Sequence, residues 1–252
     1  MCFDTDALPP DPARTGMLEG SERTTITAED GNRFAATVAR TSGSASAGIV
    51  ILPDVRGLHR YYERLAEHVA DAGVHAVALD PYGRTAGAEH RGDHFDHAPH
   101  RTAVLDDGVR ADARAAAELL RSLGASPVVS MGFCFGGRAS LLQASQEHVD
   151  GAVAFYGPPA RRENDGRSPL DEAEDGLVRV PVLGLYGGAD AGIPVADVEA
   201  YDRALDAGDI EHRIVVYPDA PHSFFDRTMT EHAEASRDAW ARVLGFVDSL
   251  AR

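Results

Sequence analysis

The segment Met131–Gly137, with the sequence MGFCFGG, constrains the fold of this chain more than any other. It has the form G-x-C-x-G and lies between a β-like run, residues 127–131, and a helix-like run, residues 138–146. This context predicts a nucleophile elbow, a tight strand-to-helix turn that has cysteine where serine is usual. Small residues at Gly132 and Gly136 let the backbone pass closely on either side. The segment therefore predicts a fold, a nucleophile and a type of chemistry together.

The helix that follows the turn favours a reactive thiol. Its N-terminus points unsatisfied N–H groups and the positive end of its dipole at Cys134. This field favours a thiolate over a thiol. The alternative at this point is a buried structural cysteine on a glycine-rich turn, because cysteine is often a core residue.

The rest of the chain alternates strand-like and helix-like runs. A β-hairpin is expected over residues 24–39. Apolar runs typical of buried strands cover residues 48–52, 75–79, 127–131, 152–156, 182–186 and 213–217. Helical spacing covers residues 61–73, 102–123, 138–146, 195–207 and 231–250. This alternation predicts an α/β fold with a mostly parallel sheet, to which the hairpin adds an antiparallel edge.

The domain organisation is expected to be simple. Residues 1–20 are acidic and proline-rich and are predicted to form an N-terminal tail. Residues 21–252 are predicted to form one domain, since no repeat or linker divides them.

Composition excludes several classes of protein. With 24 Lys and Arg against 40 Asp and Glu, the formal net charge of −16 argues against nucleic acid and anionic membrane surfaces as partners. Two cysteines, Cys2 and Cys134, are too few for a disulfide framework. The N-terminus does not resemble a signal peptide, and no apolar run is long enough for a membrane helix. These features favour a soluble protein in the reducing cytoplasm.

Two further residues follow strand-like runs, as ligand-binding residues of parallel sheets do. Asp190 follows the strand at 182–186, and His222 follows the strand at 213–217. Each has an ordinary alternative, a turn-forming aspartate and a surface histidine. Together with Cys134 they give the order nucleophile, acid, histidine of the α/β-hydrolase fold. We expect His222 to exchange protons with Cys134, and Asp190 to orient the imidazole.

An oxyanion hole requires two backbone donors. The N–H of Phe135 follows the nucleophile, and the N–H of Val55 lies in the loop after the strand at 48–52. Asp54 in that loop is a further acid near the thiol, or alternatively a cap of the following helix region.

These residues resemble the dienelactone hydrolases, a cysteine branch of the α/β-hydrolase fold, from about residue 48 to residue 250. The motifs that carry the resemblance are residues 52–57 (LPDVRG), 80–84 (DPYGR), 132–137 (GFCFGG), 187–190 (GGAD) and 221–224 (PHSF). The resemblance implies a triad of Cys134, Asp190 and His222 and a thioester acyl-enzyme.

The chain departs from the best-known members of that family. They have a glutamate, thought to help activate the cysteine, where this chain has Asp54, so Asp54 is a candidate thiol-activating group. They also bind the substrate carboxylate with arginines. Arg84 matches one of these arginine positions. At the second position this chain has Asp226, and the nearest arginine, Arg227, lies one residue later. Arg56 lies where an apolar residue is usual.

The polar loop at residues 89–100 contains His90, His94, His97 and His100. A metal tract is one interpretation, but its glycine and proline favour a lid or rim of the active site. Candidates for an apolar substrate pocket, or alternatively core residues, are Tyr82, Phe95, Tyr156, Phe224 and Phe225.

The sequence thus predicts a hydrolase of small carboxylic esters or lactones that uses no metal or organic cofactor. We expect a monomer or homodimer with a small-molecule substrate. The alternative is a non-catalytic binding or redox-sensing protein on the same fold.

Overall fold

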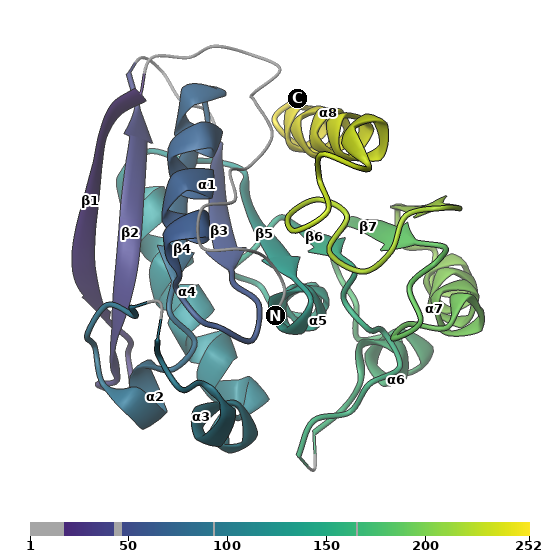
Figure 1. The fold of residues 1–252 in the computed structure, drawn as a ribbon, viewed down its shortest axis with the longest axis horizontal. Helices are drawn as coiled ribbons and strands as arrows, with labels where there is room; N and C mark the ends of the chain where they lie inside the picture. Colours follow the sequence, from purple (N-terminus) through teal and green to yellow (C-terminus); the bar gives the residue numbers. More distant parts are fainter. Residues whose placement is uncertain (1–17, 43–46, 93, 165) are drawn as a thin grey trace.

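Eight strands form one sheet in the order β1-β2-β4-β3-β5-β6-β7-β8 (Figure 1). The computed structural model describes residues 18–42, 47–92, 94–164 and 166–252. The first two strands form an antiparallel hairpin, and β2 pairs antiparallel with β4. The remaining pairs are parallel: β4 with β3, β3 with β5, β5 with β6, β6 with β7, and β7 with β8. The predicted α/β-hydrolase architecture, a mostly parallel sheet with an N-terminal hairpin, is confirmed.

The strands are β1 (Leu18–Thr27), β2 (Arg33–Thr41), β3 (Gly48–Leu52), β4 (His75–Leu79), β5 (Val128–Phe133), β6 (Gly151–Phe155), β7 (Val182–Gly187) and β8 (His212–Tyr217). The helices are α1 (Arg60–Asp71), α2 (Gly83–Ala86), α3 (Ala98–Ala103), α4 (Asp106–Ser122), α5 (Phe135–Gln143), α6 (Pro169–Glu174), α7 (Val195–Ala207) and α8 (Ala233–Leu250).

Helices cover both faces of the sheet. Alternate residues of β3 show this, because Ile49 and Ile51 pack in one core with α1 and α8, whereas Val50 and Leu52 pack in another with α4. A third cluster joins β6 to α5 and α7. In Figure 1, α1 and α8 lie in front of the sheet and α4 and α5 lie behind it. The two buried faces explain why the central strands are continuously apolar.

Some boundaries differ from the sequence-based expectation. The hairpin begins at Leu18, inside the predicted tail of residues 1–20, while residues 1–17, including Cys2, lie outside the described residues. The expected helix at 102–123 is two helices, α3 and α4, because the chain is extended at Val104 and Leu105. Helix α6 lies between the predicted strands at 152–156 and 182–186, where the sequence predicted a polar loop at residues 157–178 and no helix. Over the described ranges, no helix combines the length and the apolar character that crossing a bilayer requires.

The carboxyl ends of the parallel strands meet at one edge of the sheet, where β5 is central. The loops that follow β3, β5, β6, β7 and β8 at this edge carry the residues of the candidate site.

Candidate active site

The turn between β5 and α5 has the conformation expected of a nucleophile elbow. Cys134 has φ 54° and ψ −111°, a region that residues other than glycine rarely adopt. Its N–H donates to the backbone oxygen of Phe155 at 3.0 Å, and its own carbonyl accepts the N–H of Arg138 at 3.0 Å. The Cys134 side chain is partly exposed at the N-terminus of α5. The helix therefore directs its positive end at the sulfur.

Two glycines allow this turn. A Cβ atom on Gly132 would lie 1.9 Å from the backbone oxygen of Gly136, and one on Gly136 would lie 2.0 Å from that of Leu52. Helix α5 therefore packs directly on β5 and β3, backbone against backbone.

An imidazole–carboxylate pair lies at the ends of β7 and β8. The Nδ1 atom of His222 is 2.6 Å from Oδ2 of Asp190, and the N–H of Gly192 donates to Oδ1 of Asp190 at 2.8 Å. The Asp190 side chain is 2% exposed. Its carboxylate therefore accepts two hydrogen bonds, and the bond at Nδ1 directs the Nε2 atom of His222 away from Asp190.

The pKa of His222 reflects these contacts. Burial alone would lower it, but hydrogen bonds to Asp190 and to Cys134, together with the charges of these two groups, raise the pKa of His222 to about 10. The imidazole, the thiol and the carboxylate are thus coupled, and the contacts with Asp190 and Cys134 favour the protonated form of His222.

This raised pKa predicts how stability depends on pH. An imidazole titrates near pH 6.5 in the unfolded chain, so its contribution is complete below that pH and is lost as the pH rises through about 10. We expect the free energy of unfolding, measured by urea denaturation, to be higher for wild type than for His222→Gln. This difference should be larger at pH 6.5 than at pH 10. An equal difference at both pH values would contradict the coupling.

The loop after β3 lies beside the elbow, since Leu52 and Gly132 are register partners. The hydroxyl of Tyr82 donates to the backbone oxygen of Val55 at 2.5 Å. Burial raises the pKa of Tyr82, so its hydroxyl stays a donor. Tyr82 is fully buried and anchors this loop, while its ring lies 5.8 Å from that of Phe95. The N–H groups of Val55 and Phe135 stay our predicted oxyanion donors.

Asp54 has a local structural role. It is fully buried, its Oδ1 accepts the N–H of Arg56 at 2.8 Å, and its backbone oxygen accepts the N–H of Gly57 at 3.1 Å. Asp54 thus closes the turn that carries Val55. Helix α1 is capped by His59 instead. The role of Asp54 in activating the thiol stays a prediction.

The arginines predicted to bind substrate have different surroundings. Arg84 donates to Asp30 at 2.6 Å and to Asp112 at 2.8 Å, which ties α2 to the β-hairpin turn and to α4. The guanidinium of Arg56 lies 2.8 Å from Nε2 of His59. Arg227 is exposed. Substrate binding by these arginines stays a prediction.

Sequence reasoning did not identify Arg101, which lies near the elbow. Its guanidinium carbon is 4.6 Å from the ring centre of Phe135, the residue after Cys134, and its Nη2 is 2.5 Å from Glu163. The break between α3 and α4 separates Arg101 from the longer helix. No local pattern distinguishes it from an ordinary surface arginine, because its contacts are distant in the sequence.

The histidine-rich loop is held by a different arginine. Arg91 donates to Oδ2 of Asp80 through two nitrogens, at 3.0 and 2.7 Å, and its guanidinium carbon lies 4.7 Å from the ring centre of Phe95. The His100 ring stacks on Phe95 with centres 5.2 Å apart. This loop therefore packs on Tyr82 and the strand ends, as expected of a rim.

One group of possible metal ligands lies elsewhere. Asp202, Asp206 and His212 place ligand atoms within 4.8 Å of one another, at the end of β8 opposite to His222. Nε2 of His212 is 3.2 Å from Oδ1 of Asp202, so a direct contact between the two side chains accounts for this grouping. Among the residues that the structure describes, this is the one group of three or more ligands that converges in this way.

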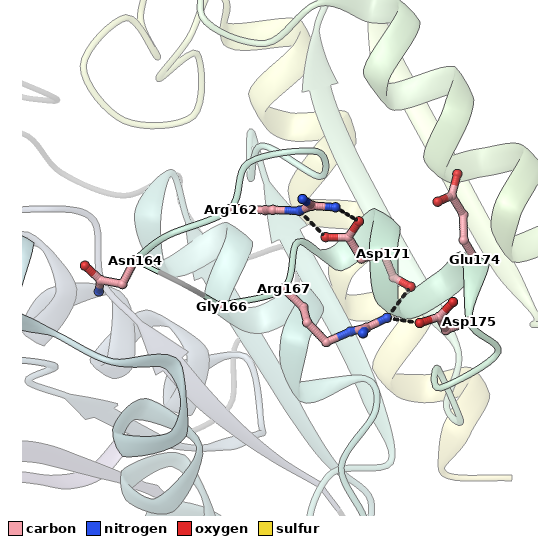
Figure 2. A pocket seen from close by; sticks show the side chains of 7 residues that line it. All are labelled: Arg162, Asn164, Gly166, Arg167, Asp171, Glu174 and Asp175. Carbon is pink, nitrogen blue, oxygen red and sulfur yellow. Dashed lines mark hydrogen bonds and ion pairs between the residues drawn. The ribbon is translucent and has the colours of Figure 1, made fainter.

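A surface pocket of about 540 Å³ lies between the loop after β6 and α6 (Figure 2). Arg162 faces Asp171 in it with contacts of 2.7 and 2.5 Å, and Arg167 is paired with Asp175. None of the predicted site residues lines this pocket. Its arginines are already neutralised by carboxylates.

Comparisons with known proteins point to one family. The family model described as "Dienelactone hydrolase family" matches residues 34–250. A protein of Escherichia coli O157:H7 named "Putative carboxymethylenebutenolidase" is 33% identical over an alignment length of 209, with a coverage of 78% of this chain and 74% of that protein. A protein of the same name from Methylorubrum extorquens AM1 is 30% identical over an alignment length of 239, with a coverage of 90% of this chain and 80% of that protein.

One solved structure is also similar to this chain in both sequence and fold. The crystal structure named as that of a "Putative Dienelactone Hydrolase" from Klebsiella pneumoniae subsp. pneumoniae MGH 78578 is 28% identical to this chain. It superposes with a TM-score of 0.78, over 91% of this chain and 98% of that one.

Proposed function

The chain belongs to the dienelactone hydrolase family, and from this premise we propose that it hydrolyses small carboxylic esters or lactones with a Cys134–His222–Asp190 triad. As a member of that family it is a dienelactone-hydrolase-like hydrolase. The nucleophile, the thioester and the substrate class belong to the proposal. The observation that carries it is the coupling of the strained Cys134 elbow to the hydrogen-bonded His222–Asp190 pair.

The reaction proceeds in two acyl transfers. The sulfur of Cys134 attacks the acyl carbon, and the carbonyl electron pair moves onto oxygen to give a tetrahedral oxyanion. Collapse of the oxyanion breaks the bond to the alkoxide, which takes its proton from the His222 imidazolium. For a lactone, the alkoxide stays attached to the acyl group.

Water then attacks the thioester and transfers one proton to His222. The second tetrahedral oxyanion collapses with departure of the Cys134 thiolate, and the carboxylic acid is released. Asp190 holds the same imidazole tautomer through both steps. Backbone N–H groups of Val55 and Phe135 stabilise both oxyanions, and each such donor typically lowers the barrier by about 3 kcal/mol.

We expect a small substrate that carries no charge where it meets Arg84 or Arg101, because their guanidinium groups already contact acidic side chains. Arg84 already contacts two carboxylates, and Arg101 contacts Glu163. A substrate carboxylate would have to compete with these side chains. The proposal therefore names esters and lactones as a class and does not require a carboxylate on the substrate.

A burst experiment tests the acyl-enzyme. With 4-nitrophenyl acetate in excess, we expect a burst of up to one nitrophenolate per chain if deacylation limits turnover. Rapid acid quench and mass spectrometry should find an acetyl group on the peptide that contains Cys134. The variant Cys2→Ala is the control, because it leaves Cys134 as the one cysteine of the chain.

Two results would contradict the proposal. One is turnover with the acetyl group on another residue. The other is reversible oxidation of Cys134 by peroxide in a protein that hydrolyses no ester, which would identify a redox sensor.

A further inference from the structure

A buried carboxyl group beside the triad has no part in the mechanism above. Asp226 is 3% exposed and follows His222 by four residues. Its Oδ2 accepts the hydroxyl of Tyr156 at 2.8 Å, and its Oδ1 accepts the N–H of Arg227. Burial of a carboxyl group is costly even when it is hydrogen-bonded, so this arrangement calls for an explanation.

Tyr156 connects this carboxyl group to the catalytic imidazole. It follows β6 directly at the same edge of the sheet, and its ring centre is 4.9 Å from that of His222. Its φ of 39° is unusual for a residue with a side chain, and its N–H donates to the backbone oxygen of Leu185 at 2.8 Å. The strained backbone fixes one end of Tyr156, and Asp226 fixes the hydroxyl end.

His222 is therefore held in two places. Asp190 holds Nδ1 of the imidazole, and the Tyr156 ring packs against the imidazole. Asp190 alone leaves the imidazole able to pivot about one hydrogen bond. The contact with Tyr156 restricts that pivot and so determines where Nε2 points.

The groups that face Asp226 come from four segments. They are Asp54 in the loop after β3, Tyr61 in α1, Tyr156 after β6, and His222 in its own loop. Burial and the charge of Asp54 raise the pKa of Asp226 to about 8. The N–H of Arg227, the Tyr156 hydroxyl and the charge of His222 act in the opposite direction and lower this pKa, but by less in total. The carboxyl group is thus mostly protonated at neutral pH and ionises just above it.

We propose that Asp226 is a positioning residue of the hydrolytic site, which acts through the Tyr156 hydroxyl to hold His222 in the orientation that serves Cys134. The inference rests on the proposed function. Ionised Asp226 would also stabilise the His222 imidazolium by its charge, which makes the imidazolium a weaker acid toward the leaving alkoxide and slows acylation.

Steady-state hydrolysis of 4-nitrophenyl acetate tests the positioning role. Tyr156→Phe and Asp226→Ala should lower kcat by about 10- to 100-fold with KM within about twofold, since small misplacements of a catalytic group cost up to this much. Asp226→Asn keeps an oxygen that accepts the Tyr156 hydroxyl, and should recover most of the lost kcat at pH 7. The matched control is Tyr217→Phe, which removes a tyrosine–aspartate hydrogen bond of the same 2.8 Å length, to Asp238. It should keep kcat within about twofold of wild type.

The pH profile separates positioning from general loss of structure. The kcat/KM of wild type should fall as the pH rises through about 8, and Asp226→Asn should lack this step because its amide does not ionise. Two results would overturn the inference: wild-type kcat in both Tyr156→Phe and Asp226→Ala, or the same step in Asp226→Asn. If instead Cys134→Ala keeps wild-type activity, the proposed function itself fails.

Discussion

Cys134→Ala is expected to lower kcat/KM for ester hydrolysis by about 10⁴-fold or more, as loss of a covalent nucleophile does in other triad enzymes. Alanine keeps the Cβ atom, so it meets the backbone strain at φ 54° as cysteine does. The side chain is partly exposed, so its loss opens no closed cavity in the core. The variant should therefore fold like wild type and lose only its chemistry.

The measurement is steady-state hydrolysis of 4-nitrophenyl acetate together with thermal unfolding of both proteins. A matching melting temperature would show that the loss of activity is chemical. Residual activity above about one tenth of wild type would mean that another group attacks the acyl carbon.

Gly132→Ala is expected to have the largest effect on stability. The new Cβ would lie 1.9 Å from the Gly136 oxygen, which belongs to the backbone of α5 and cannot rotate away. Helix α5 would have to move off the sheet, and a shift of that kind costs about 4 kcal/mol or more. We expect the variant to be recovered in insoluble form, or to unfold at a much lower urea concentration than wild type.

Gly245→Ala provides the control for this prediction. Gly245 lies inside α8, and a Cβ there would meet no atom within 4 Å. Alanine should stabilise this helix by up to about 1 kcal/mol. If both variants unfolded at the same urea concentration, the close packing of α5 on β5 would be contradicted.

The central strands and the positions of the proposed triad residues at the strand ends could be predicted because both depend on local signals. Strands β3 to β7 are buried on both faces and read as continuous apolar runs. Cys134 and Asp190 each follow such a run, His222 follows the partly buried β8, and parallel strands bring their carboxyl ends to one edge.

The break between α3 and α4 could not be predicted from local spacing. Leu105 is 60% exposed, although it lies at the point where a continuous helical pattern was expected. The chain instead places Arg101 over Phe135 and directs Asp106 to a bidentate contact with the buried Arg138. Contacts between distant segments decide this geometry.

Helix α6 did have a local signal. Ser168, Pro169 and Asp171 form a capping box with proline at the first helical turn. The surroundings of Arg84, by contrast, depend on Asp30 and Asp112, which lie 54 and 28 residues away. Tyr156 was predicted as a pocket-lining or core aromatic residue, whereas its position beside the imidazole depends on contacts with His222 and Asp226, which lie far along the chain.

The order of the strands has a consequence for synthesis of the chain. Cys134 follows β5 in the middle of the sheet, whereas His222 follows β8 at the far edge and near the end of the sequence. During translation the thiol leaves the ribosome long before the imidazole that is proposed to activate it, since segments emerge in sequence order. An incomplete chain therefore carries the cysteine without the histidine, and the proposed triad can form only once β8 has joined the sheet.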